Sequence, residues 1–347
     1  MVMKRAVLVA GGAGFVGAHT CKCLARAGYL PVVLDNLSTG HRDFVRWGPL
    51  VQADLRDTAK IAETIRQHAC LAVMHFAAFA FVGESVSEPA KYYDNNVAGT
   101  LSLLTGMRMA ECNALVFSST CAVYGQPAQV PIVEETPRDP INPYGSSKLM
   151  VERILSDFRS AYGLRSTALR YFNACGADPD TEIGELRDPE THLIPRAMMT
   201  LQGHIDNFAV FGTDFDTPDG TAIRDYVHVS DLADAHVTAL EQLLSGSPGG
   251  VFNLGTGRGY SVKEVLQAIE KVAGQRLPPA TGPRRSGDPP ILVADPTRAR
   301  QVLGFDPVRS DLATIVQTAW AWHRRAHPRR NASARVARED ILASKVS

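Results

Sequence analysis

The sequence predicts an α/β fold: a doubly wound parallel sheet with a smaller C-terminal substrate-binding lobe. Two observations carry this prediction. Short apolar runs alternate with amphipathic stretches through the first half of the chain, and this rhythm breaks after about residue 174. Apolar strands separated by helices indicate a parallel sheet that is covered on both faces. Right-handed crossovers then make the sheet doubly wound.

The first half alternates predicted strands and predicted helices. The apolar runs of strand length are residues 6–10, 31–34, 50–53, 71–76, 115–118 and 166–169. The stretches of helical length and apolar spacing are residues 17–27, 58–68, 95–110 and 144–162. We therefore assign residues 1–174 mainly to the sheet domain.

The second half is rich in turn signals. Asp178-Pro179-Asp180 and Asp188-Pro189 indicate turns, residues 212–220 are rich in Gly, Asp, Thr and Pro, and residues 277–290 are rich in proline. We expect residues 175–325 to form mainly the smaller lobe, with segments that return to the sheet. Residues 326–347 are basic and poor in large apolar side chains, which predicts a flexible tail.

The charge balance and the cysteine pattern limit the classes of protein to which this sequence can belong. Lys+Arg and Asp+Glu both number 36, so the net charge predicts no general attraction to nucleic acid or to an anionic membrane. No apolar run approaches the roughly 18 residues of a membrane span, and no secretory signal is visible. The cysteines form no CxxC pair, which predicts buried free thiols and a cytoplasmic protein. They are Cys21, Cys23, Cys70, Cys112, Cys121 and Cys175.

A glycine-rich turn follows the first predicted strand and begins the first predicted helix. Gly11, Gly14 and Gly17 are spaced so that the chain can turn tightly and bring backbone N–H groups against a pyrophosphate. The second predicted strand ends at Asp35, 18 positions after Gly17. A carboxylate there accepts hydrogen bonds from the adenosine ribose and repels a 2′-phosphate, so the pattern favours NAD over NADP and a Rossmann-type fold. A plain tight turn is the alternative for the glycines alone.

A tyrosine and a lysine stand at i and i+4 on the predicted helix 144–162. Tyr144 and Lys148 therefore share one helix face. Tyrosine has a pKa of about 10, so a neighbouring ammonium and a positive nicotinamide ring would be needed to stabilise tyrosinate. Thr120 follows the fifth predicted strand and could share a hydrogen bond with a substrate hydroxyl; for Ser119, a capping or turn role fits equally well.

At this point the residues resemble the UDP-glucose 4-epimerases (UDP-galactose 4-epimerases) of the extended short-chain dehydrogenase/reductase family. The resemblance runs from about Lys4 to about Trp322. Its more specific matches are residues 82–85, 92–100, 171–173, 220–229 and 285–288. It implies interconversion of UDP-glucose and UDP-galactose through a 4-keto intermediate, with transient hydride transfer to bound NAD. It also implies a homodimer and no metal.

The resemblance implies a role for each site residue. Tyr144 is the base for the C4 hydroxyl, Lys148 holds the nicotinamide ribose, and Thr120 takes a place where many relatives have Ser. The implied NAD contacts are Gly11, Gly14, Phe15, Val16, Gly17, Asp35, Asn36, Leu37, Ser38, Thr39, Gly40, Asp54, Leu55, Phe76, Ala77, Ala78, Ala80, Asn95, Ser118, Tyr144, Lys148 and Phe172. The implied UDP-sugar contacts are Thr120, Tyr144, Asn173, His192, Leu193, Ala209, Val210, Phe211, Arg224, Arg285, Asp288 and Leu292.

Guanidinium groups suit a pyrophosphate because they bind phosphate oxygens bidentately, although either Arg224 or Arg285 alone also fits a surface salt bridge.

Three positions depart from the pattern of the family. Ala80 stands where a subset has Lys, His192 replaces the usual Asn, and Leu292 stands where relatives have Tyr or smaller residues.

These departures leave other activities open. One is a UDP-sugar 4-epimerase acting on the xylose/arabinose or N-acetylhexosamine pair. A nucleotide-sugar dehydratase would need an Asp-Glu pair where this chain has Cys121-Ala122. A non-catalytic NAD-binding regulator is the alternative from another class, against which Tyr144, Lys148 and Thr120 argue.

Overall fold

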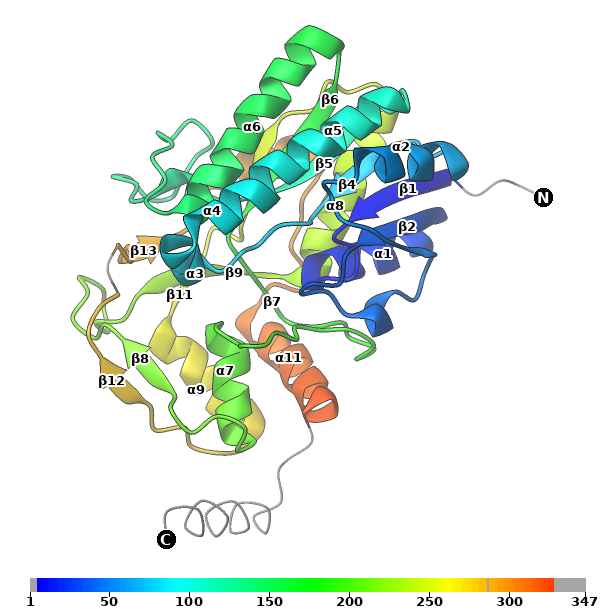
Figure 1. Cartoon of the computed structure of the whole chain (residues 1–347). Helices are drawn as coiled ribbons and strands as arrows, with labels where there is room; N and C mark the ends of the chain where they lie inside the picture. Colours follow the sequence, from blue (N-terminus) through cyan, green and yellow to red (C-terminus); the bar gives the residue numbers. More distant parts are fainter. Residues whose placement is uncertain (1–4, 286, 328–347) are drawn as a thin grey trace, which may run out of the picture.

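A seven-stranded, fully parallel sheet forms the centre of the computed structural model, which describes residues 5–285 and 287–327 (Figure 1). The strands lie in the order β3-β2-β1-β4-β5-β6-β10, so the chain order reverses between β1 and β4. Their bounds are β1 Arg5–Ala10, β2 Tyr29–Asp35, β3 Leu50–Gln52, β4 Val73–His75, β5 Ala114–Thr120, β6 Arg165–Tyr171 and β10 Val251–Leu254. The predicted doubly wound parallel sheet is confirmed.

Helices cover both faces of this sheet because alternate strand residues point in opposite directions. Val7 and Val9 belong to one apolar core with side chains of α1 and α8, whereas Ala6 and Leu8 belong to a second core with α2, α5 and α6. The bounds are α1 Phe15–Arg26, α2 Thr58–Gln67, α5 Gly99–Met109, α6 Pro143–Tyr162 and α8 Val229–Leu244.

Part of the second half of the chain returns to the sheet. Strand β10 pairs with β6, α8 contacts β5 and β6, and α10 (Thr297–Leu303) contacts β10. The rest packs around a separate apolar core that includes Ile194, Val210, Tyr226, Ile269 and Ile315 (lower part of Figure 1). Its elements are α7 Leu193–Leu201, α9 Val262–Ala273, α11 Leu312–Ala326, β7 Asn173–Cys175, β8 Ala209–Phe211, β9 Ile223–His228, β11 Gly259–Ser261, β12 Ala280–Gly282 and β13 Ile291–Leu292.

The boundaries of most predicted elements differ from the structure by one or two residues, and two of the differences lie near the candidate site. The run 71–76 contains only a three-residue strand, β4, because the chain leaves the sheet at its carboxyl end after His75. The predicted helix 95–110 is an α-helix only from Gly99; before it, η2 (Tyr93–Ala98) is a wider π-helical turn. Such turns often occur at functional sites. The predicted tail lies outside the described residues from 328 onward.

The cysteine prediction holds for four of the six side chains. Every cysteine is a free thiol, and Cys21, Cys70, Cys112 and Cys175 are buried. Cys23 and Cys121 are instead half-buried. Among the helices of the described ranges, none combines the length and the apolar character that a membrane span requires.

Five buried histidines predict a loss of stability in acid. Burial lowers the pKa of His19, His228, His236 and His323 from 6.5 to about 4, and that of His75 to about 3. The unfolded chain therefore takes up protons below pH 6.5 while the folded chain does not, so this stability is present above pH 6.5 and is lost as the pH falls towards 4. Each histidine contributes about 1.4 kcal/mol per pH unit in that window.

We expect the free energy of unfolding, measured with urea, to fall by several kcal/mol between pH 6.5 and 5. The variant His236→Gln should show a shallower fall, since one of the five groups no longer titrates. Equal stability of the wild-type protein at both pH values would contradict this prediction.

Candidate active site

The glycine turn after β1 leaves no room for side chains on its inner side. A Cβ atom on Gly11 would lie 2.4 Å from the Ala77 backbone nitrogen, and one on Gly17 would lie 2.2 Å from the Gly11 carbonyl oxygen. Gly11 also has a φ of +81°, which favours glycine. Gly14 is the N-cap of α1 and provides no side-chain cap, so backbone N–H groups are left at the helix start. This cradle fits the pyrophosphate of a dinucleotide.

Asp35 stands at the carboxyl end of β2 beside this turn. Its carboxylate is 8% exposed and accepts hydrogen bonds from the backbone N–H groups of Ala13 (3.0 Å) and Leu37 (2.8 Å). Burial raises its pKa, and these two hydrogen bonds act in the opposite direction. The loop Asn36 to Gly40 follows directly, so Asp35 is held where the sequence pattern requires a ribose-binding acid.

The remaining predicted NAD contacts follow other strands at the same edge. Asp54 comes after β3, Phe76 to Ala80 follow β4, Ser118 lies near the end of β5, and Phe172 follows β6. Asp54 accepts hydrogen bonds from Asn36 and Arg56, and the Arg56 hydrogen bonds hold its pKa well below its usual value. The carboxyl ends of six strands therefore bring these residues together, as ligand sites of this fold require.

Asn96 is a residue that the sequence interpretation missed. It is 2% exposed on η2, accepts a hydrogen bond from the Phe79 backbone N–H (2.9 Å) and donates to Ser147 on α6 (3.0 Å). The predicted contact Asn95 is half-buried and donates to the Asn96 side chain (2.9 Å). Asn96 thus ties the segment after β4 to the helix that carries Tyr144. No local pattern distinguishes two adjacent asparagines.

A close approach of α6 to the end of β5 brings Tyr144 to Thr120. A Cβ atom on Gly145 would lie 2.5 Å from the Ala122 carbonyl oxygen, so only glycine allows this contact. Asn142 caps the helix by accepting from the Gly145 N–H (2.8 Å). The Thr120 hydroxyl accepts from the Ala122 N–H (3.1 Å), and it also acts to lower the pKa of the Tyr144 hydroxyl. The capping role of this hydroxyl is therefore observed, and its role as a site residue stays a prediction.

Burial dominates the electrostatics of both α6 residues. It raises the pKa of the Tyr144 hydroxyl, while the Thr120 hydroxyl and the Arg187 charge act to lower this pKa. It lowers the pKa of Lys148 to about 7, although the Glu152 carboxylate acts to raise it. The Lys148 ammonium donates to the Ser118 carbonyl oxygen (2.8 Å). The sequence interpretation expected the Lys148 ammonium to stabilise tyrosinate. In the structure, burial instead raises the pKa of Tyr144 and lowers the pKa of Lys148, so it favours the neutral form of both side chains.

Ser119 has a structural role. It is fully buried, and its hydroxyl donates to Glu152 on α6 (2.6 Å). The same carboxylate accepts two hydrogen bonds from Arg170 of β6, at 2.9 and 2.5 Å. The end of β5, α6 and β6 are thus joined through the Glu152 carboxylate.

The two predicted pyrophosphate arginines come together on a shared aspartate. Asp288 accepts from Arg224 (2.6 Å) and from Arg285 (3.0 Å), and the Arg285 guanidinium lies 5.9 Å from the Phe211 ring centroid. Arg224 lies on β9 in register with Leu292 of β13. The Arg224 charge lowers the pKa of Cys121, against a larger rise from burial, so this group lies within electrostatic reach of the segment after Thr120.

The other predicted UDP-sugar contacts lie on neighbouring elements. Asn173 of β7 donates to the Asp225 carbonyl oxygen (2.9 Å), and Leu292 packs against a core that contains Phe172. His192 is the N-cap of α7 and Leu193 its first residue, while Ala209 and Val210 precede Phe211 in β8. His192 forms a hydrogen bond with Glu185 (2.5 Å), a residue that the sequence interpretation did not select.

Two acidic groups in the described ranges have the spacing of metal ligands. Asp178, Asp180 and Glu182 all bind the Lys22 ammonium, at 2.7 to 2.8 Å. The second group consists of Glu185, Glu190 and His192. Arg187 donates a hydrogen bond to Glu185 of this group. A protein cation therefore already contacts each group.

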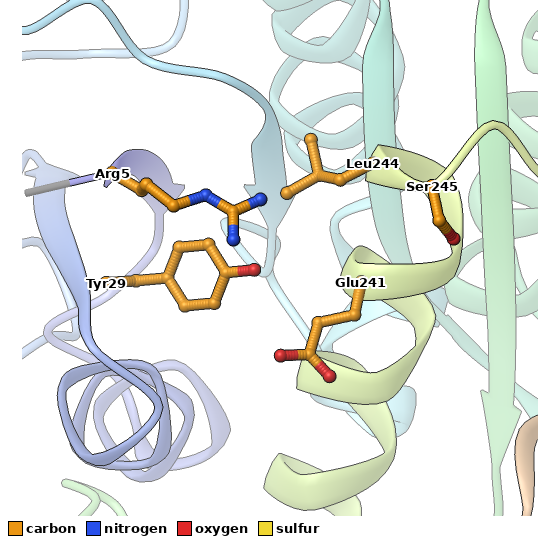
Figure 2. Close-up of a pocket in the computed structure, with 5 residues that line it drawn as sticks. All are labelled: Arg5, Tyr29, Glu241, Leu244 and Ser245. Atoms are coloured by element: carbon orange, nitrogen blue, oxygen red, sulfur yellow. The ribbon is translucent and has the colours of Figure 1, made fainter.

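A shallow pocket of about 280 Å³ lies at the opposite end of the sheet (Figure 2). Arg5 and Tyr29, the first residues of β1 and β2, line it together with Glu241 near the end of α8. The glycine turn follows the other end of β1, so this pocket is separate from the candidate active site.

Comparison with known proteins identifies the family. The model of the NAD dependent epimerase/dehydratase family matches residues 7–255. The chain belongs to that family. This epimerase/dehydratase family member is 53% identical to a UDP-glucose 4-epimerase of Rhizobium meliloti (strain 1021), over 92% of this chain and 97% of the relative.

Two solved structures extend the likeness to the fold. A UDP-glucose 4-epimerase from Brucella ovis in complex with NAD is 56% identical, with a TM-score of 0.90 over 91% of this chain and 98% of that one. A UDP-glucose 4-epimerase from Bifidobacterium longum in complex with NAD+ and UDP is 37% identical, with a TM-score of 0.88 over 93% of this chain and 99% of that one.

Proposed function

We propose that this protein interconverts UDP-glucose and UDP-galactose with bound NAD, the reaction of UDP-glucose 4-epimerase. The observation that carries the proposal is the close approach of α6 to the end of β5, which brings Tyr144 towards Thr120 at the strand edge that also holds the glycine cradle and Asp35. The high identity to UDP-glucose 4-epimerases over nearly the whole of both chains supports it. Residues 1–174 mainly bind NAD in this proposal, and residues 175–325 mainly bind the UDP-sugar.

Each group of side chains has a task in this reaction. When bound, NAD supplies the redox chemistry by which C4 of the sugar is oxidised to a ketone and reduced again. Tyr144 accepts the proton of the C4 hydroxyl, and Thr120 orients that hydroxyl between the two side chains. Lys148 holds the nicotinamide ribose. Arg224 and Arg285 bind the pyrophosphate, which leaves the sugar free to turn its other face towards the cofactor.

The variant Tyr144→Phe tests the assignment of the base. It removes only the proton acceptor, so the rate of UDP-galactose epimerisation should fall by roughly 10²- to 10⁴-fold. NAD(H) released by denaturing the purified protein should remain at the wild-type level. Tyr162→Phe, an exposed change at the other end of α6, is the matched control and should keep the wild-type rate. Near-normal turnover of Tyr144→Phe would remove this residue from the mechanism.

A second candidate activity, epimerisation of UDP-GlcNAc, is favoured by Leu292. This residue lies in register with Arg224 and contacts the core around Phe172, beside the proposed sugar site. Leucine is smaller than tyrosine, so an acetamido group at C2 should fit. We expect Leu292→Tyr to lower turnover of UDP-GlcNAc by about tenfold or more and to spare UDP-glucose.

Substrate-panel kinetics and melting temperature together check this gate. Leu292→Met, which conserves volume, should leave both substrates unaffected. If Leu292→Tyr instead lowers the melting temperature and harms both substrates alike, the residue only packs in the core, where the larger ring is a steric clash.

We also propose that the protein is a cytoplasmic homodimer that pairs through α5 and α6. Leu101 and Met109 of α5 and Met150 of α6 are 40 to 50% exposed, and Arg108 of α5 lies 3.7 Å from the Tyr162 ring centroid of α6. An apolar helical face of this kind is typical of an interface. Sedimentation should show a dimer that Leu101→Glu combined with Met150→Glu dissociates. A wild-type monomer at micromolar concentration would contradict the proposal.

A further inference from the structure

A second pocket, of about 330 Å³, lies where α6 covers the edge of the sheet, between α6, β6 and the edge strand β10. We call it the α6 pocket. Small residues make room for it: Ser166 and Ala168 stand two apart on β6 and so share its face towards α6, and Gly250 precedes β10. None of the described residues that line this pocket is a predicted contact of NAD or of the UDP-sugar.

Three arginines surround the α6 pocket. Arg138 belongs to the loop before α6, and Arg153 and Arg159 belong to α6 itself. Arg159 donates one N–H group to the Ser166 carbonyl oxygen (2.8 Å). Arg138 and Arg153 are exposed, and neither forms a hydrogen bond or an ion pair with any residue that the structure describes. Because a guanidinium carries five N–H groups, most of these donors are available to a ligand.

The α6 pocket has an excess of positive charge. Glu152 is the acidic residue among the described residues that line it, and Arg170 compensates this carboxylate with two hydrogen bonds, at 2.9 and 2.5 Å. Asp139 and Asp157 lie close to the three arginines in the sequence, but within the described ranges they form no ion pair with them. The uncompensated guanidinium groups therefore attract an anion to this part of the surface.

A buried hydroxyl adds a further donor to the α6 pocket. Ser166 is 4% exposed, and its hydroxyl has no hydrogen-bond partner among the residues that the structure describes. Buried polar side chains of proteins usually have such a partner. Since Ser166 lines the pocket from the face of β6 that points towards α6, its hydroxyl is placed to donate to the same ligand as the arginines.

We propose that the α6 pocket is a second anion site, which binds a compact phosphorylated anion through Arg138, Arg153, Arg159 and the Ser166 hydroxyl. Guanidinium groups bind phosphate oxygens bidentately. Three guanidinium groups and a hydroxyl match the several oxygens and the double charge of a phosphoryl group better than those of a single carboxylate. The volume lies at the lower end of the roughly 300–1,000 Å³ of ligand pockets, so a compact anion fits better than a dinucleotide.

The test is calorimetric titration of the full-chain holoenzyme with inorganic pyrophosphate and, separately, with glycerol 3-phosphate. One equivalent of UDP fills the active site beforehand, and the ionic strength is held constant so that screening does not change. We expect one binding event per chain. Binding of pyrophosphate alone identifies an inorganic ligand, whereas binding of glycerol 3-phosphate extends the class to phosphate esters.

Arg138→Gln combined with Arg153→Gln should weaken this binding by about tenfold or more, because hydrogen bonds to a charged ligand are lost. Both side chains are exposed and unpaired within the described structure, so the melting temperature should stay that of the wild type. Arg153→Lys keeps the charge but loses the planar fork, and it should weaken binding by a smaller factor.

Two further variants are matched controls. Arg276→Gln removes a positive charge that is 92% exposed and does not line the pocket, so it should leave the affinity unchanged. Arg285→Gln removes a proposed pyrophosphate contact of the active site and should also leave this binding unchanged.

Absence of binding for both probes at millimolar concentration would overturn the inference, as would equal affinity of the double variant and the wild type. An equal loss in Arg276→Gln would show general charge attraction in place of a site. Loss of binding in Arg285→Gln, with the double variant unaffected, would place the anion at the active site instead.

Discussion

The buried ion pair between Glu152 and Arg170 is the constraint on which the rest of the site depends. The two side chains are 4% and 1% exposed, and two hydrogen bonds join them between α6 and β6. Ser119 donates to the same carboxylate, and Arg170 also donates to the Tyr124 hydroxyl. Removing one partner of such a pair costs about 3–5 kcal/mol because the other charge is left buried and unpaired. Helix α6 therefore has one favourable position against the sheet.

This position of α6 also places Tyr144 and Lys148. Both lie on the turns of α6 before Glu152, and the helix start is pressed against the end of β5 through Gly145. The same glycine-mediated close approach recurs after β1, where Gly11 meets the segment that follows β4. The edge of the sheet is rigid for this reason: backbone contacts replace side chains where a dinucleotide must come near the chain.

Burial by itself disfavours the charged side chains that the proposed reaction requires. Burial favours neutral Tyr144 and neutral Lys148, whereas proton abstraction requires tyrosinate and is helped by an ammonium. A buried site strengthens the effect of every charge placed in it, so a nearby cation opposes the effect of burial on Tyr144. The second half of the chain delivers such cations, Arg187 and Arg224, to residues that the first half positions.

The sequence by itself determined the fold and predicted the residues of a chemical centre. Apolar alternation indicated the strands that form the parallel sheet, glycine spacing and Asp35 indicated the dinucleotide, and the i, i+4 spacing indicated Tyr144 with Lys148, since all of these are local patterns. Only the tertiary structure shows the contacts of Asn96, Glu152, Arg170 and Glu185. Asn96 and Ser147 are 51 residues apart in the sequence, and Glu152 and Arg170 are 18 apart. Glu185 and His192 are 7 residues apart. From the sequence, a charged or amide side chain is expected to be exposed to solvent. Only the folded structure shows that it is buried against a specific partner.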